Sequence, residues 1–419
     1  MKKKTGLTLL LCLLLAAGSM SACGIAQTAP QPATAETAET AGDTQSEETT
    51  ATAEETTGVD EETTGAAEET TAEAETTAES TTTDEAATEE TTATDSASML
   101  SYWTDTAKLK SELVSYMDAI TAEGSADFIP VEDRIAVFDF DGTLFCETDP
   151  NYFDYTLLRY RVLEDPDYID KASDFEKEVA EKITRQNETG ESFEGLEVDH
   201  GKAVASSFAG MTLAEMNAYI QEFKKQDMPS YDGMKRGDGF YLPMLQVIDY
   251  LQANDFTVYI VSGTDRFIVR GIIDGSGLNI PPAQIIGSDE SLVATSQGDE
   301  DGRTYTFTPD DSVILGGEFL IKNLKMNKVT VINQEIGKQP VLSFGNSSGD
   351  GSMAEFVISH NPHKSLAFML CCDDLDRENG NIQKAEKMEA MCEEYGWIPV
   401  SMKNDWTTIY GDSVTYKKQ

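Results

Sequence analysis

Four short apolar runs constrain the fold of this chain more than any other feature. Each is continuous and rich in β-branched or aromatic residues, as strands buried on both faces of a sheet are. The runs are IAVF (135–138), TVYIV (257–261), VLSF (341–344) and SLAFML (365–370). Segments with helical spacing lie between them, among them 242–254 and 328–336. This alternation predicts an α/β fold, a Rossmann-like three-layer sandwich around a mainly parallel sheet.

A further helix is predicted before the first run. Its apolar residues recur mostly at spacings of three or four and would pack against the sheet. They are Trp103, Leu109, Leu113, Met117 and Ile120.

The first 23 residues have the layout of a bacterial lipoprotein signal peptide. Three lysines precede an apolar stretch that is shorter than the roughly 20 residues a membrane span needs. Residues 21–24, Ser-Ala-Cys-Gly, resemble a lipobox, although Met20 stands where Leu is usual. The resemblance implies lipidation of Cys23, and hence an extracytoplasmic protein that is anchored to the cell membrane through its N-terminal lipid.

Residues 24–98 form a Thr-, Glu- and Ala-rich segment with no aromatic residue, no Lys and no Arg, and with 20 Asp and Glu. Such a composition cannot bury enough apolar surface to offset the entropy of ordering. We therefore expect a disordered acidic linker between the anchor and a folded domain.

The remaining residues, 99–419, are numerous enough for one large domain and carry 27 more acidic than basic side chains. A nucleic-acid-binding protein would show the opposite sign, so no nucleic-acid partner is expected. This part contains four cysteines, which permit disulfides in an exported protein without showing any pairing. They are Cys146, Cys371, Cys372 and Cys392.

The first apolar run continues into two acidic residues in AVFDFDGTLF (136–145). In parallel sheets ligands bind beyond the carboxyl ends of the strands, which is where Asp139 and Asp141 fall. Being two residues apart, both can face the same side. Gly142 permits a sharp turn, and Thr143 adds a hydroxyl.

The string FDFDGT (138–143) resembles the first motif of the haloacid dehalogenase superfamily, whose phosphatases use an aspartate nucleophile and Mg²⁺. Ser262 stands where that family's second motif ends the next core strand, and Lys328 matches the lysine of the third. GNSSGD (345–350) resembles the acidic fourth motif. This form of the motif and the closing VSMKNDWTTIY (400–410) are similar to exported phosphatases of the phosphoserine-phosphatase-like branch.

The resemblance implies a Mg²⁺-dependent phosphomonoester hydrolase that acts on small phosphorylated metabolites outside the cytoplasm. Asp139 would be the nucleophile and Asp141 the general acid and base, with Ser262 and Lys328 stabilising the phosphoryl group. The Mg²⁺ ligands would come from four residues, and three others would bind substrate. The implied ligands are Asp139, Asp141 through its backbone carbonyl, Asn346 and Asp350, and the implied substrate-binding residues are Thr143, Gly263 and Thr264.

Two of these assignments leave alternatives. Asn346 replaces the first acid of the fourth motif and brings no charge, which makes Asp350 the expected carboxylate of that loop. Lys322, Lys325 and Lys338 are rivals to Lys328.

More than 90 residues separate the first motif from the next core strand, and about 146–239 are expected to form a helical cap over the site. Thr212 and Glu215 form a capping-box pattern within this insertion. Glu147, Tyr152 and Phe153 follow the motif closely and are candidates for lining the pocket, although packing within the cap is expected for the two aromatic residues.

The three histidines, His200, His360 and His363, form no ligand pattern, so zinc catalysis is not expected. Asp141 favours phosphoryl transfer, since dehalogenase members lack this second acid. Two other functions stay open: a phosphotransferase of the same fold, and a surface binding protein of impaired activity, which Asn346 would support.

Overall fold

The computed structural model describes residues 98–418. The predicted signal peptide, Cys23 and the predicted linker up to residue 97 lie outside the described residues. Within the described part of the chain, no helix is both long enough and apolar enough to cross a membrane.

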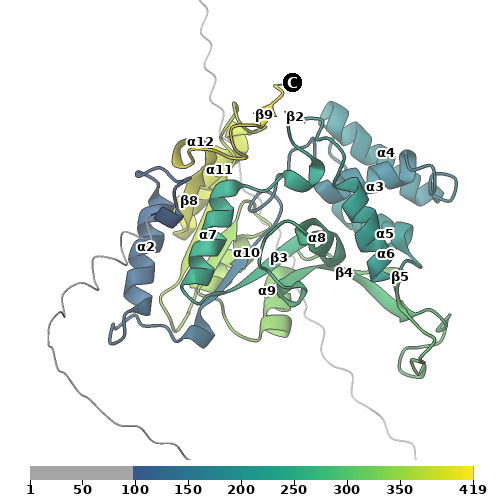
Figure 1. Ribbon diagram of the computed structural model, residues 1–419, viewed down its shortest axis with the longest axis horizontal. Helices are drawn as coiled ribbons and strands as arrows, with labels where there is room; N and C mark the ends of the chain where they lie inside the picture. Colours follow the sequence, from purple (N-terminus) through teal and green to yellow (C-terminus); the bar gives the residue numbers. More distant parts are fainter. Residues whose placement is uncertain (1–97, 419) are drawn as a thin grey trace, which may run out of the picture. The chain divides into compact units, whose positions relative to one another are not determined.

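The core is a seven-stranded sheet in the order β5-β4-β3-β1-β6-β7-β8 (Figure 1). Neighbouring strands from β4 to β8 in this order are parallel, and only β5 is antiparallel to its neighbour, β4. The strands are β1 (Ile135–Phe138), β3 (Thr257–Asp265), β4 (Ile285–Ala294), β5 (Val313–Ile321), β6 (Leu342–Gly345), β7 (Leu366–Cys371) and β8 (Ile398–Ser401). The predicted α/β fold with a mainly parallel sheet is confirmed.

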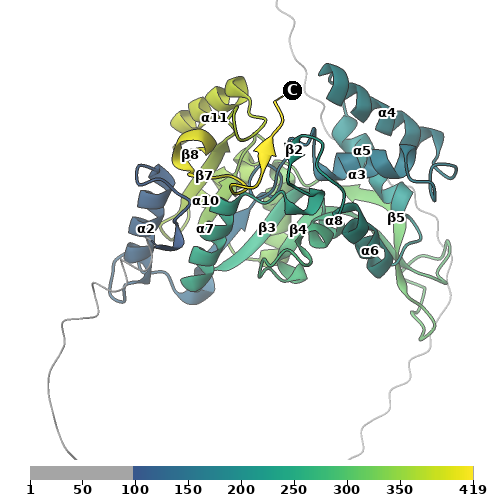
Figure 2. The ribbon, with the colours of Figure 1, turned by 45° about the horizontal axis from the view of Figure 1, so that its top comes forward.

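Helices cover both faces of this sheet, as Figures 1 and 2 show. Alternate residues of β1 point to opposite faces: Ala136 and Phe138 belong to the apolar cluster that includes α2 and α7, while Val137 packs with α9 and α10. The core helices are α2 (Lys108–Thr121), α7 (Leu242–Ala253), α8 (Arg266–Ile273), α9 (Met326–Val331), α10 (Gly351–Ile358), α11 (Ile382–Tyr395) and the short α12 (Met402–Asp405). The result is a three-layer sandwich.

Four helices lie between β1 and α7 in the chain and form a group beside the sheet (Figure 1). They are α3 (Phe153–Leu163), α4 (Asp174–Thr189), α5 (Leu196–Phe208) and α6 (Leu213–Phe223). The predicted capping box is present at the start of α6, where Thr212 and Glu215 bond each other's backbone N–H groups. We call α3–α6 the cap helices.

The long strands β4 and β5 form an antiparallel arm that passes beside the cap helices (Figure 2). Helix α5 approaches β5 so closely that a Cβ at Gly201 would lie 2.5 Å from the Phe319 ring. A separate two-stranded sheet pairs β2 (Tyr231–Asp232) with β9 (Thr415–Tyr416). The arm and the small sheet were not anticipated from the sequence.

Two helices differ in their residue ranges from the sequence prediction. Trp103 lies outside α2, which begins at Lys108, and its ring instead packs edge-on against Trp406 at a centroid distance of 5.8 Å. The helix expected at 328–336 begins earlier, at Met326, and ends in a π-helical turn, Ile332–Ile336.

Candidate active site

The register of three neighbouring strands brings the sequence motifs to one edge of the sheet. Phe138, the last residue of β1, is paired with Ile260 on β3 and with Phe344 on β6. Asp139 follows directly, and its backbone N–H donates to the carbonyl of Phe344 at 2.9 Å. The carboxyl ends of these strands therefore place the first and fourth motifs in contact.

The turn after Asp141 depends on a glycine. Gly142 has φ +75°, and a Cβ there would lie 1.9 Å from Nδ2 of Asn346. The Thr143 hydroxyl donates to Oδ1 of Asn346 at 3.5 Å. A larger residue at position 142 would therefore strain the turn and displace the Asn346 side chain.

Lys328 connects the nucleophile candidate to the fourth motif. Its Nζ lies 2.6 Å from Oδ1 of Asp139 and 2.7 Å from Oδ1 of Asp350, and it also donates to the carbonyl of Val261 at 2.6 Å. The lysine is fully buried. Burial alone would lower the pKa of Lys328, but the two carboxylates raise it above its ordinary value, so the side chain stays charged.

The rival lysines lie elsewhere. Lys338 pairs with Asp133 at 2.7 Å on the surface, and Lys325 is exposed. Lys322 lines the cavity described below but forms no ion pair with Asp139 or Asp350. Among these lysines, Lys328 alone bridges the two acids.

The fourth-motif loop is held in shape by Asp350. Its Oδ2 accepts hydrogen bonds from the backbone N–H groups of Asn346 (3.1 Å) and Ser347 (2.9 Å). The amide Nδ2 of Asn346 donates to Oε2 of Glu147 at 3.1 Å. This leaves Oδ1 of Asn346, which accepts only the long bond from Thr143, turned toward the aspartate loop.

Asp141 has the environment of a carboxylic acid. Its Oδ2 accepts from the hydroxyl of Thr264 at 2.7 Å, while its buried Oδ1 has no hydrogen-bond partner within the described structure. Burial and the nearby Asp154 raise the pKa of Asp141 well above its ordinary value. A protonated Asp141 at neutral pH can donate a proton.

Asp139 is also affected by its surroundings. Burial raises its pKa to about 7, the neighbouring Asp350 adds to the rise, and Lys328 opposes it. When Asp139 and Asp350 are both ionised, the single charge of Lys328 leaves one negative charge in excess between the two loops. A bound cation would offset this charge.

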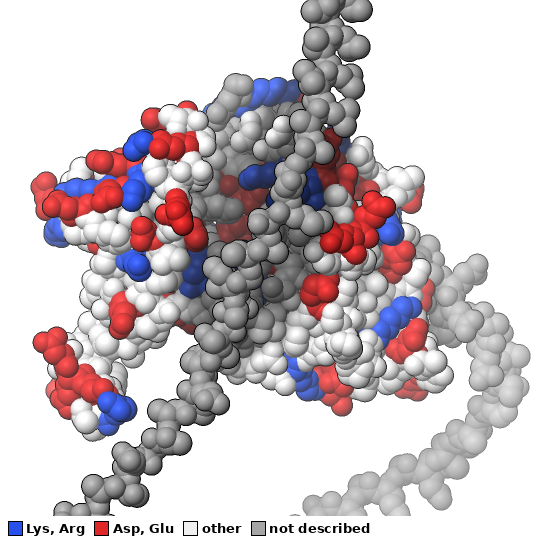
Figure 3. Space-filling view, turned by 180° about the vertical axis from the view of Figure 1, so that it is seen from behind, with Lys and Arg blue, Asp and Glu red and all other residues white. Residues whose placement is uncertain are grey.

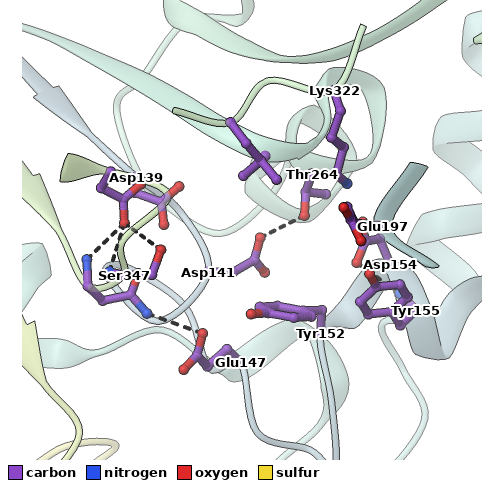
Figure 4. A pocket seen from close by; sticks show the side chains of 14 residues that line it. Asp139, Asp141, Glu147, Tyr152, Asp154, Tyr155, Glu197, Thr264, Lys322 and Ser347 are labelled. Atoms are coloured by element: carbon purple, nitrogen blue, oxygen red, sulfur yellow. Dashed lines mark hydrogen bonds between the residues drawn. The ribbon is translucent and has the colours of Figure 1, made fainter. Parts of the chain in front are cut away.

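These residues surround a cavity of about 150 Å³ (Figure 4). Its lining comes from the ends of the core strands and from the cap helices. The lining residues are Asp139, Asp141, Glu147, Tyr152, Asp154, Tyr155, Glu197, Gly263, Thr264, Lys322, Leu324, Asn346, Ser347 and Asp350.

Of the nine residues predicted for the active site, six line this cavity: Asp139, Asp141, Gly263, Thr264, Asn346 and Asp350. Thr143, Ser262 and Lys328 are fully buried next to it and are not among the lining residues. The Ser262 hydroxyl accepts the backbone N–H of Thr264 at 3.0 Å, which fixes the Gly263–Thr264 segment. Cys23 lies outside the described residues.

The donor set fits Mg²⁺ better than a transition metal. Asp139, Asn346 and Asp350 offer oxygen atoms, and Mg²⁺ is commonly held by one or two carboxylates together with water and substrate phosphate. No group of three or more His, Cys, Asp or Glu side chains within residues 98–418 is placed to hold a metal ion by itself. An all-protein zinc site is thus not found in this part of the chain.

Four cavity residues were missed in the sequence analysis: Asp154, Tyr155, Glu197 and Leu324. Glu147 lines the cavity, as the sequence suggested. Tyr152 both lines the cavity and packs on Tyr155, whereas Phe153 packs edge-on against Phe145 and is not among the lining residues. The only sequence signal for Tyr152, Asp154 and Tyr155 was their closeness to the first motif.

The four cysteines of the described domain are free thiols. Arg377, in the segment that follows β7, pairs locally with Asp374 at 2.6 Å and does not line the cavity.

No family model matches the chain, and no curated protein matches it. Among solved structures, it is similar to a functionally unknown protein from Anaerococcus prevotii (14% identity, 70% of this chain and 91% of that one, TM-score 0.42). It is also similar to cytosolic 5'-nucleotidase IIIB bound to cytidine (10%, 71% and 87%, 0.43) and to a substrate-bound phosphoserine phosphatase (18%, 57% and 86%, 0.31). These likenesses are too distant to decide a function, which has to be inferred from the site itself.

Proposed function

We propose that this chain is a Mg²⁺-dependent phosphomonoester hydrolase of the haloacid dehalogenase type that forms an aspartyl-phosphate. The observation that carries the proposal is the bridge of buried Lys328 between Asp139 and Asp350, next to an Asp141 with a free carboxyl oxygen. A structural ion pair would not need a second, unsatisfied acid at the same cavity.

In the first step, an Asp139 oxygen attacks the phosphorus, and the bond from phosphorus to the alcohol oxygen breaks. Asp141 gives its proton to that oxygen, so the alcohol leaves neutral. In the second step, the Asp141 carboxylate takes a proton from water, whose oxygen attacks the phosphorus; the bond between phosphorus and the Asp139 oxygen breaks, and phosphate leaves. Asp139 and Asp141 return to their starting states.

The remaining residues position these two acids. Lys328 keeps Asp139 oriented and supplies positive charge close to the phosphoryl group. Thr264 orients Asp141, and its backbone N–H is fixed by Ser262. Mg²⁺, held by Asp139, Asp350, Asn346 and the carbonyl of Asp141, would offset the repulsion between the phosphate and the carboxylates.

The test is hydrolysis of 4-nitrophenyl phosphate with Mg²⁺ or with EDTA. We expect activity that requires Mg²⁺ and is lost in Asp139→Asn, while Asp127→Asn, a surface substitution of the same type, keeps it. A beryllofluoride complex should place the phosphate analogue on Asp139. Analogue bound elsewhere, or activity unchanged in Asp139→Asn, would refute the proposed mechanism.

We propose further that the protein acts outside the cytoplasm, anchored by a lipid on Cys23. The support is the sequence of residues 1–24 and the acidic composition of 24–98.

A further inference from the structure

Glu147 lies next to a candidate Mg²⁺ ligand but has no part in the mechanism proposed above. Its Oε2 accepts a hydrogen bond from Nδ2 of Asn346 at 3.1 Å, which Figure 4 shows as the dashed line at Glu147. This contact lies against the turn of the first motif, because a Cβ at Gly142 would be 2.8 Å from Oε2 of Glu147. Glu147 is therefore placed where the loops of the first and fourth motifs meet.

The hydrogen bond fixes which end of the Asn346 amide faces the aspartate loop. An ionised carboxylate can only accept, so it holds the NH₂ group of the amide and leaves Oδ1 on the other side. Oδ1 lies 3.5 Å from the Thr143 hydroxyl, and the backbone N–H of Asn346 donates to Asp350 at 3.1 Å. Without the acceptor on Glu147, the amide is free to turn its nitrogen inward, and Mg²⁺ binds oxygen ligands.

The segment that carries Glu147 is held on both sides of this residue. The backbone N–H of Cys146 donates to the carbonyl of Gly239 at 2.8 Å. The Thr148 hydroxyl donates to Oε1 of Glu378, a fully buried carboxylate, at 2.5 Å. A side chain presented by such a fixed segment can hold a metal ligand in one orientation.

Glu147 also brings a carboxylate back to the fourth motif. Asn346 replaces the first acid of that motif, and Glu147 lies one hydrogen bond away from its amide. Burial, and less strongly Glu378 and Asp350, raise the pKa of Glu147, while Lys384 on α11 opposes the rise. A bound cation would oppose it further, because positive charge favours the ionised form.

We infer that Glu147 is a positioning residue of the Mg²⁺ site, which orients the amide of Asn346 and supplies the negative charge that Asn346 lacks. This inference rests on the metal site of the proposed function. It does not require Glu147 to touch the substrate or the metal. It accounts for an amide in the fourth motif without loss of the cation.

The test is a double-mutant cycle on Mg²⁺ affinity, measured by calorimetric titration of the full chain without substrate. The Mg²⁺ bound by Asp139→Asn gives the background from other acidic residues of the chain. We expect Glu147→Gln to raise the Kd for Mg²⁺ by about tenfold or more, since it no longer fixes the ligand or adds charge. Glu194→Gln, at an exposed glutamate that does not line the cavity, is the control and should leave the Kd unchanged.

A double variant exchanges the acid and the amide. In Glu147→Gln combined with Asn346→Asp, the new amide can donate to the new carboxylate, and the Kd should return to within about threefold of the original. Asn346→Asp alone should improve the Kd much less, because two carboxylates then face each other. If Asn346→Asp changed the Kd by the same factor in both backgrounds, the two side chains would act independently, and the inference would be overturned.

Kinetics separate this role from a contact with the substrate. Raising the Mg²⁺ concentration should restore the kcat of Glu147→Gln for 4-nitrophenyl phosphate, since only metal binding is weakened. An unfolded variant would not recover in this way. An unchanged Kd for Mg²⁺ together with a raised KM would assign Glu147 to the substrate and overturn the inference.

This inference and the proposed function can fail separately. Mg²⁺ binding that depends on Asp139 but not on Glu147 would overturn the role of Glu147 and leave the phosphatase intact. The absence of any Mg²⁺ binding that depends on Asp139 would refute the metal site of the proposed function first.

Discussion

Lys328 determines the charge balance of the site. It is a fully buried ammonium, and two carboxylates and a backbone carbonyl accept its three hydrogens. A buried pair of this kind contributes little net stability compared with apolar residues, but removing one partner leaves the other charges unpaired. The presence of this buried lysine on helix α9 is therefore better explained by chemistry than by stability.

We predict that Lys328→Met lowers kcat for 4-nitrophenyl phosphate by about 100-fold or more, because positive charge near the phosphoryl group is lost. In EDTA it should also lower the free energy of unfolding by about 3–5 kcal/mol, since Asp139 and Asp350 lose their counter-charge. Lys338→Met, at a surface pair, is the control and should change neither quantity measurably. A Lys328→Met enzyme with half of the original kcat would contradict the assigned role.

Glu290 on β4 is a second buried acid, outside the proposed catalytic set. It is 4% exposed, and neither carboxylate oxygen has a hydrogen-bond partner in the described structure. It lines a small cavity of about 10 Å³ together with Asp154, His200, Asp265 and Lys322. Burial, and then Asp265 and Asp289, raise the pKa of Glu290 to about 9.

The raised pKa of Glu290 determines how the free energy of unfolding changes with pH. Between the ordinary pKa of a glutamate, near 4.5, and about 9, the folded state holds a proton that the unfolded state has released, so stability falls as pH rises through this window. We predict that Glu290→Gln stabilises the protein at pH 8 by about 1–3 kcal/mol, with little effect at pH 5.

Thermal unfolding at the two pH values measures the difference. Glu318→Gln, an exposed glutamate on the neighbouring strand β5, is the matched control and should leave the melting temperature unchanged at both. If Glu290→Gln gave the same change at pH 5 and pH 8, Glu290 would not be protonated in the folded state at pH 8.

At the same scale, the sequence predicted the core side of the cavity better than the cap side. FDFDGT and GNSSGD each begin at the last residue of a strand, so the parallel register alone brings Asp139, Asp141 and Asp350 together. Glu197 comes from helix α5, whose position depends on packing against α4 and β5. No spacing in the sequence encodes that packing, which is why Glu197 could not be found.

Among the helices and strands, too, some were predictable from the sequence and others were not. Three of the four strands predicted from continuous apolar runs, β1, β6 and β7, begin and end within one residue of the prediction, because burial on both faces leaves no polar positions. The fourth, β3, begins at Thr257 as predicted but runs on to Asp265, four residues beyond its apolar run. In β5, VILGGEFLI contains two glycines and a glutamate, and most of its residues are at least partly exposed. A half-exposed arm has neither a continuous run nor a clean alternation, so the pattern gave no prediction there.

Helix α6 depends on its first turn. The Thr212 side chain accepts the backbone N–H of Glu215, whose carboxylate accepts the backbone N–H of Thr212 at 2.8 Å. We predict that Thr212→Ala lowers the free energy of unfolding by about 1 kcal/mol, because the amide of Glu215 loses its side-chain acceptor. Urea unfolding of this variant measures the change. The control is Thr189→Ala at the end of α4, which removes exposed hydroxyl bonds to Arg185 and Glu191 but no N-terminal cap.

If Thr212→Ala and Thr189→Ala lowered the free energy of unfolding by the same amount, well below about 1 kcal/mol, the capping box would contribute no more than the exposed hydroxyl of Thr189. Activity toward 4-nitrophenyl phosphate should be unchanged in Thr212→Ala, since α6 contributes no residue to the proposed active-site cavity.

For the whole molecule, charge is the dominant property. The chain carries a formal net charge of −44, and acidic and basic side chains are interspersed on the face of the described part shown in Figure 3. An excess of negative charge disfavours contact with polyanions and with anionic lipid headgroups. Attachment to a membrane through basic surface patches is therefore not expected, and a covalent lipid would have to supply it.

We predict that the full chain, expressed in a bacterium, is recovered with the membranes and incorporates labelled palmitate, and that Cys23→Ser abolishes the labelling and releases the protein. One acyl chain binds a membrane only marginally, so stable recovery requires the multiple acyl chains of a lipoprotein. Cys12→Ser, which changes a cysteine within the apolar part of the predicted signal, is the control and should keep both label and attachment. Membrane recovery of Cys23→Ser equal to that of the original chain would show that something other than a lipid on this residue holds the protein there.

Because the linker is expected to contribute no residue to the active site, the released Cys23→Ser protein should hydrolyse 4-nitrophenyl phosphate with an unchanged kcat/KM.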